Sequence, residues 1–450
     1  MYQKILIANR GEIAVRIIRA CREMGIMSVA VCSTADKEAL HAQLADECIC
    51  IGSPKPKDSY LNIERILSAA VASGAEAIHP GFGFLSENAK FARMCQQCGI
   101  DFIGPSPETI EKMGDKAEAR KTMMQADVPV IPGTREALTV AGEAKILARE
   151  IGYPVIIKAS AGGGGKGMRV ASREEEFEEL FRVAQQETMQ AFADDQMYLE
   201  KYLQNAKHVE IQILADKYGN TVHLGERDCS IQRRHQKMVE ETPAAFLSEK
   251  TRKAMGEAAV KAAKAAGYYS AGTIEFLVDK DENFYFMEMN TRIQVEHPVT
   301  EMVTGIDLMK QMIRISAGEK LGFEQDEICR KGCAIECRIM AENPEKKFLP
   351  SAGEITELYI PGGKDVRVDS SLYSGYKVPP FYDSMLAKVI VHGETREEAI
   401  GKMRSALGEM IIEGIPTNLS FQYELIGSKE FESGDSEAIN QMLERILEGM

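Results

Sequence analysis

Residues 273–298 read TIEFLVDKDENFYFMEMNTRIQVEHP, and this stretch predicts a β-hairpin followed by a short polar segment. Two strand-like runs, 273–279 and 284–290, flank the polar turn 280–283. Runs of this length that are rich in aromatic and β-branched residues and bounded by a polar turn are typical of paired antiparallel strands. The sequence therefore predicts a hairpin whose second strand leads directly into a group of charged residues.

The register of this hairpin brings two acidic side chains together. If Asp279 pairs with Phe284, then Glu275 faces Glu288, with Asn290 further along the same face, because strand side chains repeat with a period of two. Like charges placed opposite each other destabilise a sheet unless a cation lies between them. Oxygen ligands without His or Cys favour Mg²⁺ or Mn²⁺ carrying nucleotide phosphates. We therefore predict a metal site here; a solvated polar face with a slipped register is the alternative.

The segment after the hairpin contains groups that bind anions or move protons. Arg292 offers a planar fork that matches carboxylate, phosphate or bicarbonate. Glu296 can serve as a general base, whereas we expect His297, which precedes Pro298, to be structural. A second basic and polar run at 232–237 is either a solvated loop or an anion site.

A glycine cluster at 162–167 joins an apolar strand at 154–159 to a second strand at 168–170. The bare backbone N–H groups of such a loop can close over phosphates, and Lys158 just before the loop supports that interpretation. The cluster is not a Walker A loop, because its last glycine is followed by Met168 and it joins two strands. A flexible surface turn is the alternative.

The first 110 or so residues alternate between predicted strands and helices, which indicates a parallel α/β unit. The predicted strands are 4–8, 28–32 and 76–79, and the predicted helices are 12–24 and 60–73. The turn after the first strand lacks the second and third glycines of the dinucleotide-binding fingerprint. A nicotinamide cofactor is therefore not expected.

We expect the 450 residues to form three domains. An N-terminal α/β domain covers 1–114. A domain of mixed α+β character covers 115–330 and includes a lid at about 131–203, and a C-terminal domain covers 331–446. Within the second domain, a strand predicted around 221–225 ends several residues before the basic run.

Composition places the chain among soluble globular proteins. The hydrophobic fraction is 44% and the charged fraction 27%, and the net charge of −14 opposes a general affinity for nucleic acid or acidic membranes. No stretch approaches the roughly 18 uninterrupted apolar residues of a membrane-spanning helix. The apolar run at 1–8 is too short for a signal peptide. We therefore expect a cytoplasmic protein that binds neither nucleic acid nor membrane.

Ten scattered cysteines suit a reducing compartment better than a disulfide framework. Cys95 and Cys98 have metal-ligand spacing, but no second pair lies nearby, so we expect helix thiols rather than a zinc site. Cys333 and Cys337 belong to the apolar face of a predicted strand. The same alternation places Arg338 on the opposite face, where we expect it to be free to act.

Four stretches resemble the ATP-grasp superfamily and, within it, the biotin carboxylases. They are IANRGEIA (7–14), HPGFGFLSEN (79–88), GGGGKG (162–167) and FMEMNTRIQVEHP (286–298). The resemblance covers essentially the whole chain, and the last stretch is highly specific. It implies an ATP-grasp fold with a Rossmann-like N-terminal domain of parallel sheet, a mobile glycine-loop lid and a C-terminal biotin-carboxylase domain.

The resemblance implies a two-step reaction. ATP would phosphorylate bicarbonate to carboxyphosphate, whose breakdown would supply CO₂ to N1 of biotin. This is the first half-reaction of acetyl-CoA carboxylase, which leads to malonyl-CoA and fatty acids; a subunit serving another acyl-CoA carboxylase or a pyruvate carboxylase is the alternative. The chain has no Met-Lys-Met biotin-attachment motif. We therefore expect it to act on a separate biotin carboxyl carrier protein, alongside carboxyltransferase subunits and as a homodimer.

The resemblance also implies roles for individual residues. ATP would contact Lys116, Lys158, Gly164, Gly165, Glu200, Lys201, Leu203, His208, Gln232, His235 and Leu277. The metals, two Mg²⁺ or Mn²⁺ ions, would bind Glu275, Glu288 and Asn290. Bicarbonate would lie among Lys237, Arg292, Gln294 and Val295, and Glu296 would remove its proton. Arg338 would stabilise the biotin enolate, which makes Lys237, Arg292, Glu296 and Arg338 the implied catalytic residues.

One position departs from the family pattern, and two other classes of function remain open. Phe82 stands where many relatives carry Tyr, so its ring can stack on biotin but cannot donate a hydrogen bond. Another carboxylate- or carbamate-activating ATP-grasp enzyme, such as a carbamoyl-phosphate synthetase fragment or a purine-pathway carboxylase, could share the metal hairpin. Residues 79–88 and the region of Arg338 favour biotin. A non-catalytic nucleotide-binding subunit would have lost at least one implied catalytic residue, and all are present.

Overall fold

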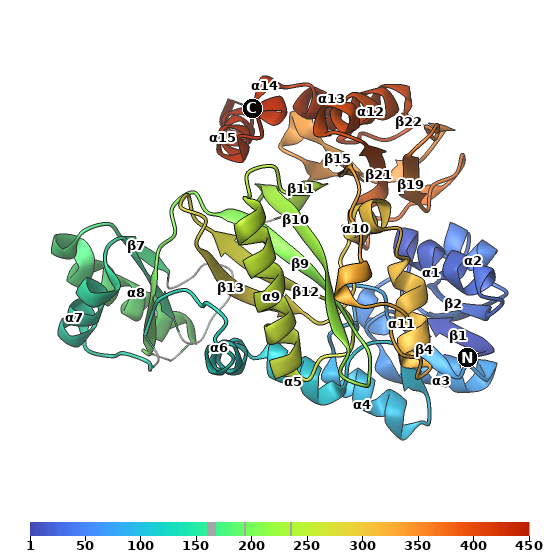
Figure 1. Ribbon diagram of the computed structural model, residues 1–450. Helices are drawn as coiled ribbons and strands as arrows, with labels where there is room; N and C mark the ends of the chain where they lie inside the picture. Colours follow the sequence, from blue (N-terminus) through green and yellow to red (C-terminus); the bar gives the residue numbers. More distant parts are fainter. Residues whose placement is uncertain (135, 160–167, 193–194, 235, 450) are drawn as a thin grey trace. The chain divides into compact units, whose positions relative to one another are not determined.

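Two compact units make up the computed structural model (Figure 1), which describes residues 1–134, 136–159, 168–192, 195–234 and 236–449. The first unit comprises Met1–Val128, Lys207–Phe276 and Glu288–Met450, and the second comprises Pro129–Ala206 and Leu277–Met287. The predicted lid at about 131–203 falls within the range of the second unit. The three domain boundaries stay predictions.

A five-stranded parallel sheet forms the N-terminal part of the first unit. Its strand order is β3 (Glu47–Gly52), β2 (Met27–Ser33), β1 (Lys4–Ile7), β4 (Ala77–His79) and β5 (Asp101–Phe102). The helices of this part are α1 (Gly11–Glu23), α2 (Leu40–Leu44), α3 (Ile63–Ser73), α4 (Ala89–Gln97), α5 (Pro107–Gly114) and α6 (Lys116–Gln125). Parallel strands need such crossover connections, and the predicted parallel α/β class is confirmed. Helix α3 begins at Ile63 rather than near residue 60, because the Asn62 side chain accepts a hydrogen bond from Arg65 N–H and caps the helix there.

His79, at the end of β4, is fully buried, and its Nδ1 accepts a hydrogen bond of 3.1 Å from the backbone N–H of Gly81. Burial, with a smaller contribution from the charge of Arg16, lowers the pKa of His79 from 6.5 to about 3. The unfolded chain binds a proton below pH 6.5 whereas the folded chain does not. His79 therefore makes the free energy of unfolding fall as the pH decreases from about 6.5 towards 3.

A His79→Asn variant should keep the acceptor for Gly81 and lose this pH dependence. Between pH 7 and pH 5 we expect the wild type to lose about 2 kcal/mol more unfolding free energy than the variant, since each unit of pKa difference corresponds to about 1.4 kcal/mol. Thermal melting at both pH values measures this difference. Melting temperatures that fall in parallel in the two proteins would contradict the assignment.

An eight-stranded sheet runs through the rest of the first unit. Its order is β13 (Phe284–Asn290), β12 (Ser270–Val278), β9 (Lys207–Ala215), β10 (Thr221–Arg233), β11 (Gln236–Thr242), β14 (Cys333–Met340), β21 (Met385–Gly393) and β19 (Val366–Ser370). The pairs from β9 to β19 are antiparallel. The sheet is thus continuous across β11 and β14, on either side of residue 330. The turn between β12 and β13 belongs to the second unit.

Strand β10 is longer than predicted, and the strand end expected around residue 225 is wrong. Arg227 lies inside the strand, fully buried, because the buried carboxylate of Glu210 on β9 balances its charge. Gln232 and Lys237 are Cα partners on β10 and β11. Gln232 and Arg233 thus end β10, and Gln236 and Lys237 begin β11, so these four residues of the basic run belong to strands, whereas Arg234 is exposed.

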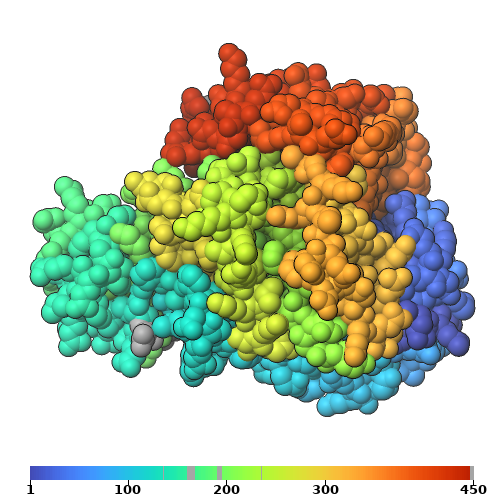
Figure 2. Space-filling model, viewed as in Figure 1, coloured from blue at the N-terminus to red at the C-terminus, as the bar shows by residue number. Residues whose placement is uncertain are grey.

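Helices cover the eight-stranded sheet, and α9, α10 and α11 contribute to the yellow-green to orange part of the surface in Figure 2. The α-helices that follow β11 along the chain are α9 (Glu249–Ala266), α10 (His297–Thr304), α11 (Leu308–Ser316), α12 (Arg396–Glu409), α13 (Leu419–Ile426), α14 (Lys429–Ser433) and α15 (Ser436–Gly449). Short ladders pair β15 (Glu342–Asn343) with β16 (Leu349–Pro350), β17 (Gly353–Glu354) with β20 (Lys377–Val378), and β18 (Glu357–Tyr359) with β22 (Ile411–Glu413). Cys337 lies in the C-terminal hydrophobic core with Cys333 packed against it, which confirms the apolar face predicted for β14.

The second unit contains a three-stranded antiparallel sheet, ordered β7 (Arg169–Ala171), β6 (Val155–Ala159) and β8 (Met197–Lys201). Helices α7 (Ala141–Ile151) and α8 (Glu174–Phe192) pack on it. Ile157, Phe177, Phe181 and Leu199 are fully buried in the core between them. Among the helices that the structure describes in both units, none is long and apolar enough to cross a lipid bilayer.

Candidate functional site

Glu296, the residue before α10, is the centre of a buried charge cluster. Its side chain is 0% exposed; Lys237 Nζ lies 2.6 Å from its Oε1, and Arg338 Nη2 lies 3.0 Å from its Oε2. Burial alone would raise the pKa of Glu296, but Lys237, Arg338 and Arg227 hold this pKa well below its usual value. The carboxylate is therefore ionised at neutral pH.

Arg338 on β14 is not free, contrary to the prediction from strand alternation. Its guanidinium donates to the carboxylates of Glu240 on the neighbouring β11 and of Glu296. The alternation correctly excludes Arg338 from the apolar core, but the opposite face of the strand is packed rather than solvated. Burial raises the pKa of Glu240 to about 7 even though the charge of Arg338 opposes this.

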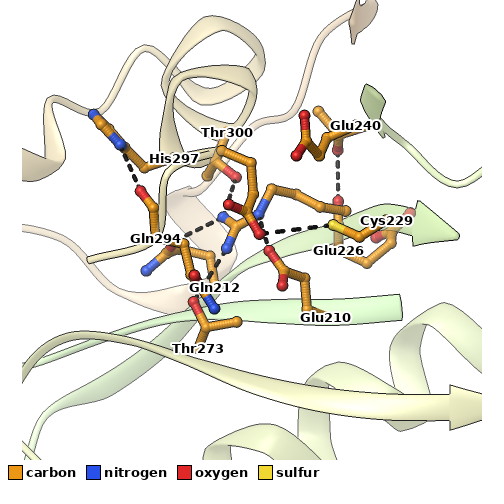
Figure 3. A network of polar contacts seen from close by, with 12 residues as sticks. Glu210, Gln212, Glu226, Cys229, Glu240, Thr273, Gln294, His297 and Thr300 are labelled. Carbon is orange, nitrogen blue, oxygen red and sulfur yellow. Dashed lines mark hydrogen bonds and ion pairs between the residues drawn. The ribbon is translucent and has the colours of Figure 1, made fainter. Parts of the chain in front are cut away.

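Arg227 is the common donor to four side chains that Figure 3 labels. Its guanidinium donates to Glu210 (2.5 Å), Gln212 (2.7 Å), Thr300 (2.9 Å) and Thr273 (3.1 Å). Figure 3 shows these acceptors converging from neighbouring strands and from the helix that carries Thr300. Lys237 Nζ also lies 2.6 Å from Glu210 Oε2. Buried cations and carboxylates therefore alternate through the sheet, and each charge is compensated by its neighbours.

Glu275 on β12 has the surroundings of a strongly held anion. Its carboxylate contacts His208 Nε2 (2.7 Å), Lys237 Nζ (3.1 Å), Asn290 Nδ2 (2.7 Å) and Gln294 Nε2 (2.9 Å). Burial opposes ionisation, but Lys237 and His208 lower the pKa of Glu275 to about 2. One ligand atom from each of His208, Glu210 and Glu275 lies within 4.8 Å of the other two, a spacing that could hold a metal ion.

Glu288 lies close enough to Glu275 for the two charges to interact. Burial and the charge of Glu275 both raise the pKa of Glu288, while Lys116 at the start of α6 lowers it. At the turn of the hairpin, the Asp279 N–H donates to the Asn283 carbonyl at 2.9 Å. The pairing of Asp279 with Phe284 stays a prediction. The proximity of the two glutamates does not depend on that pairing.

Arg292 is held by acceptors on both sides. Its Nε lies 2.9 Å from Glu87 Oε2, and its two terminal nitrogens donate to Gln294 Oε1 (2.6 Å) and Asn290 Oδ1 (2.9 Å). Glu87 also accepts a 3.0 Å hydrogen bond from the Thr291 N–H. The N-terminal part of the first unit thus positions the segment that follows β13.

Models of three domain families match nearly the whole chain. They are described as the biotin carboxylase N-terminal domain (residues 1–110), the carbamoyl-phosphate synthase L chain ATP-binding domain (115–324) and the biotin carboxylase C-terminal domain (336–444). Biotin carboxylase 1 of Bacillus subtilis is 58% identical over 436 residues, which cover 97% of each chain. The chain belongs to the biotin carboxylase family.

Solved structures agree with membership of the biotin carboxylase family. The biotin carboxylase from Campylobacter jejuni, described as a complex with β,γ-ATP, is 52% identical, with a TM-score of 0.89 over 97% of each chain. The biotin carboxylase domain dimer of 2-oxoglutarate carboxylase from Hydrogenobacter thermophilus is 50% identical, with a TM-score of 0.90 over 99% of each chain. That structure is described as containing MgADP, ADP and bicarbonate. The ATP-grasp fold predicted from the sequence is therefore confirmed.

The residues that the biotin carboxylase resemblance assigned to ATP fall in both units. In the first unit, Gln232 Nε2 lies 2.9 Å from His208 Nδ1. In the second, Lys158 on β6 forms an ion pair with Glu200 on β8, and Lys201 donates to two backbone carbonyls, while Leu203 and Leu277 are partly buried. Gly164, Gly165 and His235 lie outside the described residues.

Phe82, assigned to biotin in the same way, is partly buried against the core around α1. Its backbone carbonyl accepts a 2.7 Å hydrogen bond from Asn9 Nδ2. Cys95 is buried in α4 and Cys98 is exposed at its end, as the helix-thiol interpretation expected.

Sequence reasoning missed Glu87, Glu210, Arg227 and Glu240 as members of this candidate site. Glu87 stands inside the quoted stretch 79–88, but nothing local indicates that it binds Arg292. Glu210 left a usable signal, because it alternates with apolar residues in a strand that is otherwise buried. A charged residue on such a strand needs an internal partner.

Proposed function

We propose that the protein uses ATP and bicarbonate to carboxylate biotin carried on a biotin carboxyl carrier protein. The observation that carries this proposal is the fully buried, ionised Glu296 between Lys237 and Arg338. A carboxylate in this setting accepts the proton of bicarbonate, and the released oxygen attacks the terminal phosphate of ATP. Carboxyphosphate and ADP are the products of this step. Carboxyphosphate then breaks down to phosphate and CO₂; the phosphate takes up the N1 proton of biotin, and the N1 anion bonds to CO₂.

The cations around Glu296 suit the charges of this reaction. Lys237, Arg292, Gln294 and the backbone of Val295 would surround bicarbonate, and Arg338 would stabilise the negative charge that develops on the biotin ring. Bicarbonate and the terminal phosphate bring several negative charges together, and fixed positive groups offset their repulsion in the transition state. Phe82 is proposed to contact the biotin ring through its face.

A divalent cation fits the residues assigned to it. The pKa of Glu288 is raised by burial and by the neighbouring charge of Glu275, which is the situation that a bound Mg²⁺ or Mn²⁺ relieves. Glu275, Glu288 and Asn290 supply the oxygen ligands that these ions prefer. The ions would neutralise the phosphate oxygens of ATP. Lys116, Lys158, Gly164, Gly165, Glu200, Lys201, Leu203, His208, Gln232, His235 and Leu277 are proposed to hold the nucleotide.

We place this reaction as the first half-reaction of acetyl-CoA carboxylase, in a cytoplasmic homodimer that works with separate carboxyltransferase subunits. The ten cysteines, all within the described residues, are free thiols, in keeping with a reducing compartment. The 2-oxoglutarate carboxylase relative supports a second candidate acceptor, a 2-oxo acid. Mixing the carboxylated carrier with each carboxyltransferase distinguishes the two.

The test of the proposed function is ATP cleavage by the purified protein with Mg²⁺ and bicarbonate. We expect ADP release to increase when free biotin is added and to depend on bicarbonate. A Glu288→Lys variant, which places a cation where the metal would bind, should fold and show no cleavage. If biotin has no effect on a bicarbonate-dependent rate, the biotin assignment fails although an ATP-grasp carboxylate-activating reaction survives.

A further inference from the structure

Lys388 on β21 is a fully buried cation to which the proposed reaction gives no role. Its side chain is 0% exposed, and its Nζ donates a 2.8 Å hydrogen bond to the backbone carbonyl of Val295. Glu12 Oε1 lies 3.1 Å from the same nitrogen and Asp369 Oδ2 lies 4.0 Å from it. A buried ammonium group is costly unless it is paired and hydrogen-bonded. These two carboxylates and the buried carboxylate of Glu336 balance the charge, and the hydrogen bond to Val295 fixes the direction of the ammonium group.

The peptide group that Lys388 holds is the one that leads into Glu296. The carbonyl of Val295 and the N–H of Glu296 lie in one rigid plane, so fixing the first also fixes the backbone from which the Glu296 side chain departs. Residues 294–297 form a turn whose two ends are joined by a hydrogen bond, because the Gln294 carbonyl accepts from His297 Nδ1 at 2.8 Å. The Val295 carbonyl between them is bound from another strand.

Two neighbouring strands hold two consecutive residues of this turn. Lys388 and Arg338 are Cα partners on β21 and β14, so their side chains lie on the same face of the sheet. Arg338 binds the side chain of Glu296, and Lys388 binds the carbonyl of Val295. The C-terminal part of the first unit therefore fixes both the backbone and the carboxylate of the proposed base.

We propose that Lys388 is a positioning residue that holds the Val295–Glu296 peptide group and thereby aims the Glu296 carboxylate at bicarbonate. This inference rests on the proposed function. Lys388, on a C-terminal strand, would thus take part in the removal of the bicarbonate proton by Glu296, which lies in the segment after β13. Lys388 does not contact the reacting atoms.

The experiment compares Lys388→Met with the charge-neutral double variant Glu12→Gln/Lys388→Met. A shift of about 1 Å in a reacting group can cost up to about a hundredfold in rate. We therefore expect Lys388→Met to lower kcat/KM for bicarbonate by about ten- to a hundredfold and to leave the KM for ATP within about twofold. The double variant removes Lys388 together with the Glu12 carboxylate that lies 3.1 Å from it, so it should be more stable than Lys388→Met, yet keep the full kinetic defect.

Two controls separate positioning from stability. Glu12→Gln alone retains the Lys388 hydrogen bond and should keep a wild-type KM for bicarbonate. Lys402→Met removes a lysine of α12 that binds Asp365 and Glu398 and should also leave the kinetics unchanged.

Recovery of wild-type kinetics in the double variant would overturn the proposal, since Lys388 would then only balance charge. Failure of the double variant to fold would overturn it as well, by assigning a purely structural role. Absence of bicarbonate-dependent cleavage in the wild type would instead refute the proposed function.

Discussion

Replacing Glu296 with glutamine should lower bicarbonate-dependent ATP cleavage by at least about a hundredfold, because a positioned general base contributes roughly 10²- to 10⁴-fold. Glutamine preserves the size of the side chain and an acceptor for Lys237 and Arg338, but it cannot take up the bicarbonate proton. Steady-state ADP release, measured with saturating ATP and varied bicarbonate, reports the loss.

The matched control for this substitution is Glu257→Gln, on the exposed face of α9. It makes the same chemical change far from the cluster and should leave the rate unchanged. A Glu296→Gln protein that retains most of its bicarbonate-dependent activity would exclude Glu296 as the base. It would also transfer that role to another group near Lys237.

Replacing Arg227 with methionine should produce the largest loss of stability, about 3–5 kcal/mol, the usual cost of removing one partner from a buried ion pair. Arg227 is fully buried, and its four acceptors would lose their common donor. Glu210 would keep Lys237 as its only close cation among the described residues. Chemical denaturation, monitored by far-UV circular dichroism, measures the change.

A double variant, Arg227→Met/Glu210→Gln, tests the reason for this loss. Removing both charges should recover part of the stability, because no uncompensated carboxylate then remains in the sheet. If the double variant is less stable than Arg227→Met, packing of the long arginine side chain matters more than its charge. An unchanged unfolding midpoint in the single variant would contradict the buried network itself.

The sequence predicts the fold class well because periodicity records which side of an element is buried. The parallel N-terminal sheet follows from apolar runs that alternate with helical stretches, and the hairpin ending at Asn290 follows from two strand-like runs around a polar turn. The apolar face of β14 follows from alternation of apolar residues. Strand β3 was missed, because its exposed positions are Cys48 and Cys50 and its one buried position is Ile51, a pattern that does not follow an alternation of polar and apolar residue types.

The candidate site was harder to predict, because buried ion pairs hide their members. The sequence predicted that a strand ends before Arg227 and that Arg338 is free. In the structure each arginine is paired with a carboxylate from the neighbouring strand. Local sequence contains no information about a partner that is 17 or 98 residues away. The family resemblance supplied the role proposed for Arg338, whereas its hydrogen bond to Glu240 was found only in the structure.

The unbroken hydrogen bonding from β11 to β14 has a mechanical consequence. Lys237 and Glu240 lie on β11 and Arg338 lies on the neighbouring β14 of the same sheet. Arg338 donates a hydrogen bond from this sheet to Glu296. The proposed proton acceptor and the arginine proposed for the biotin ring are therefore both held to one rigid sheet. Their hydrogen bond fixes the spacing between these two groups before any substrate binds.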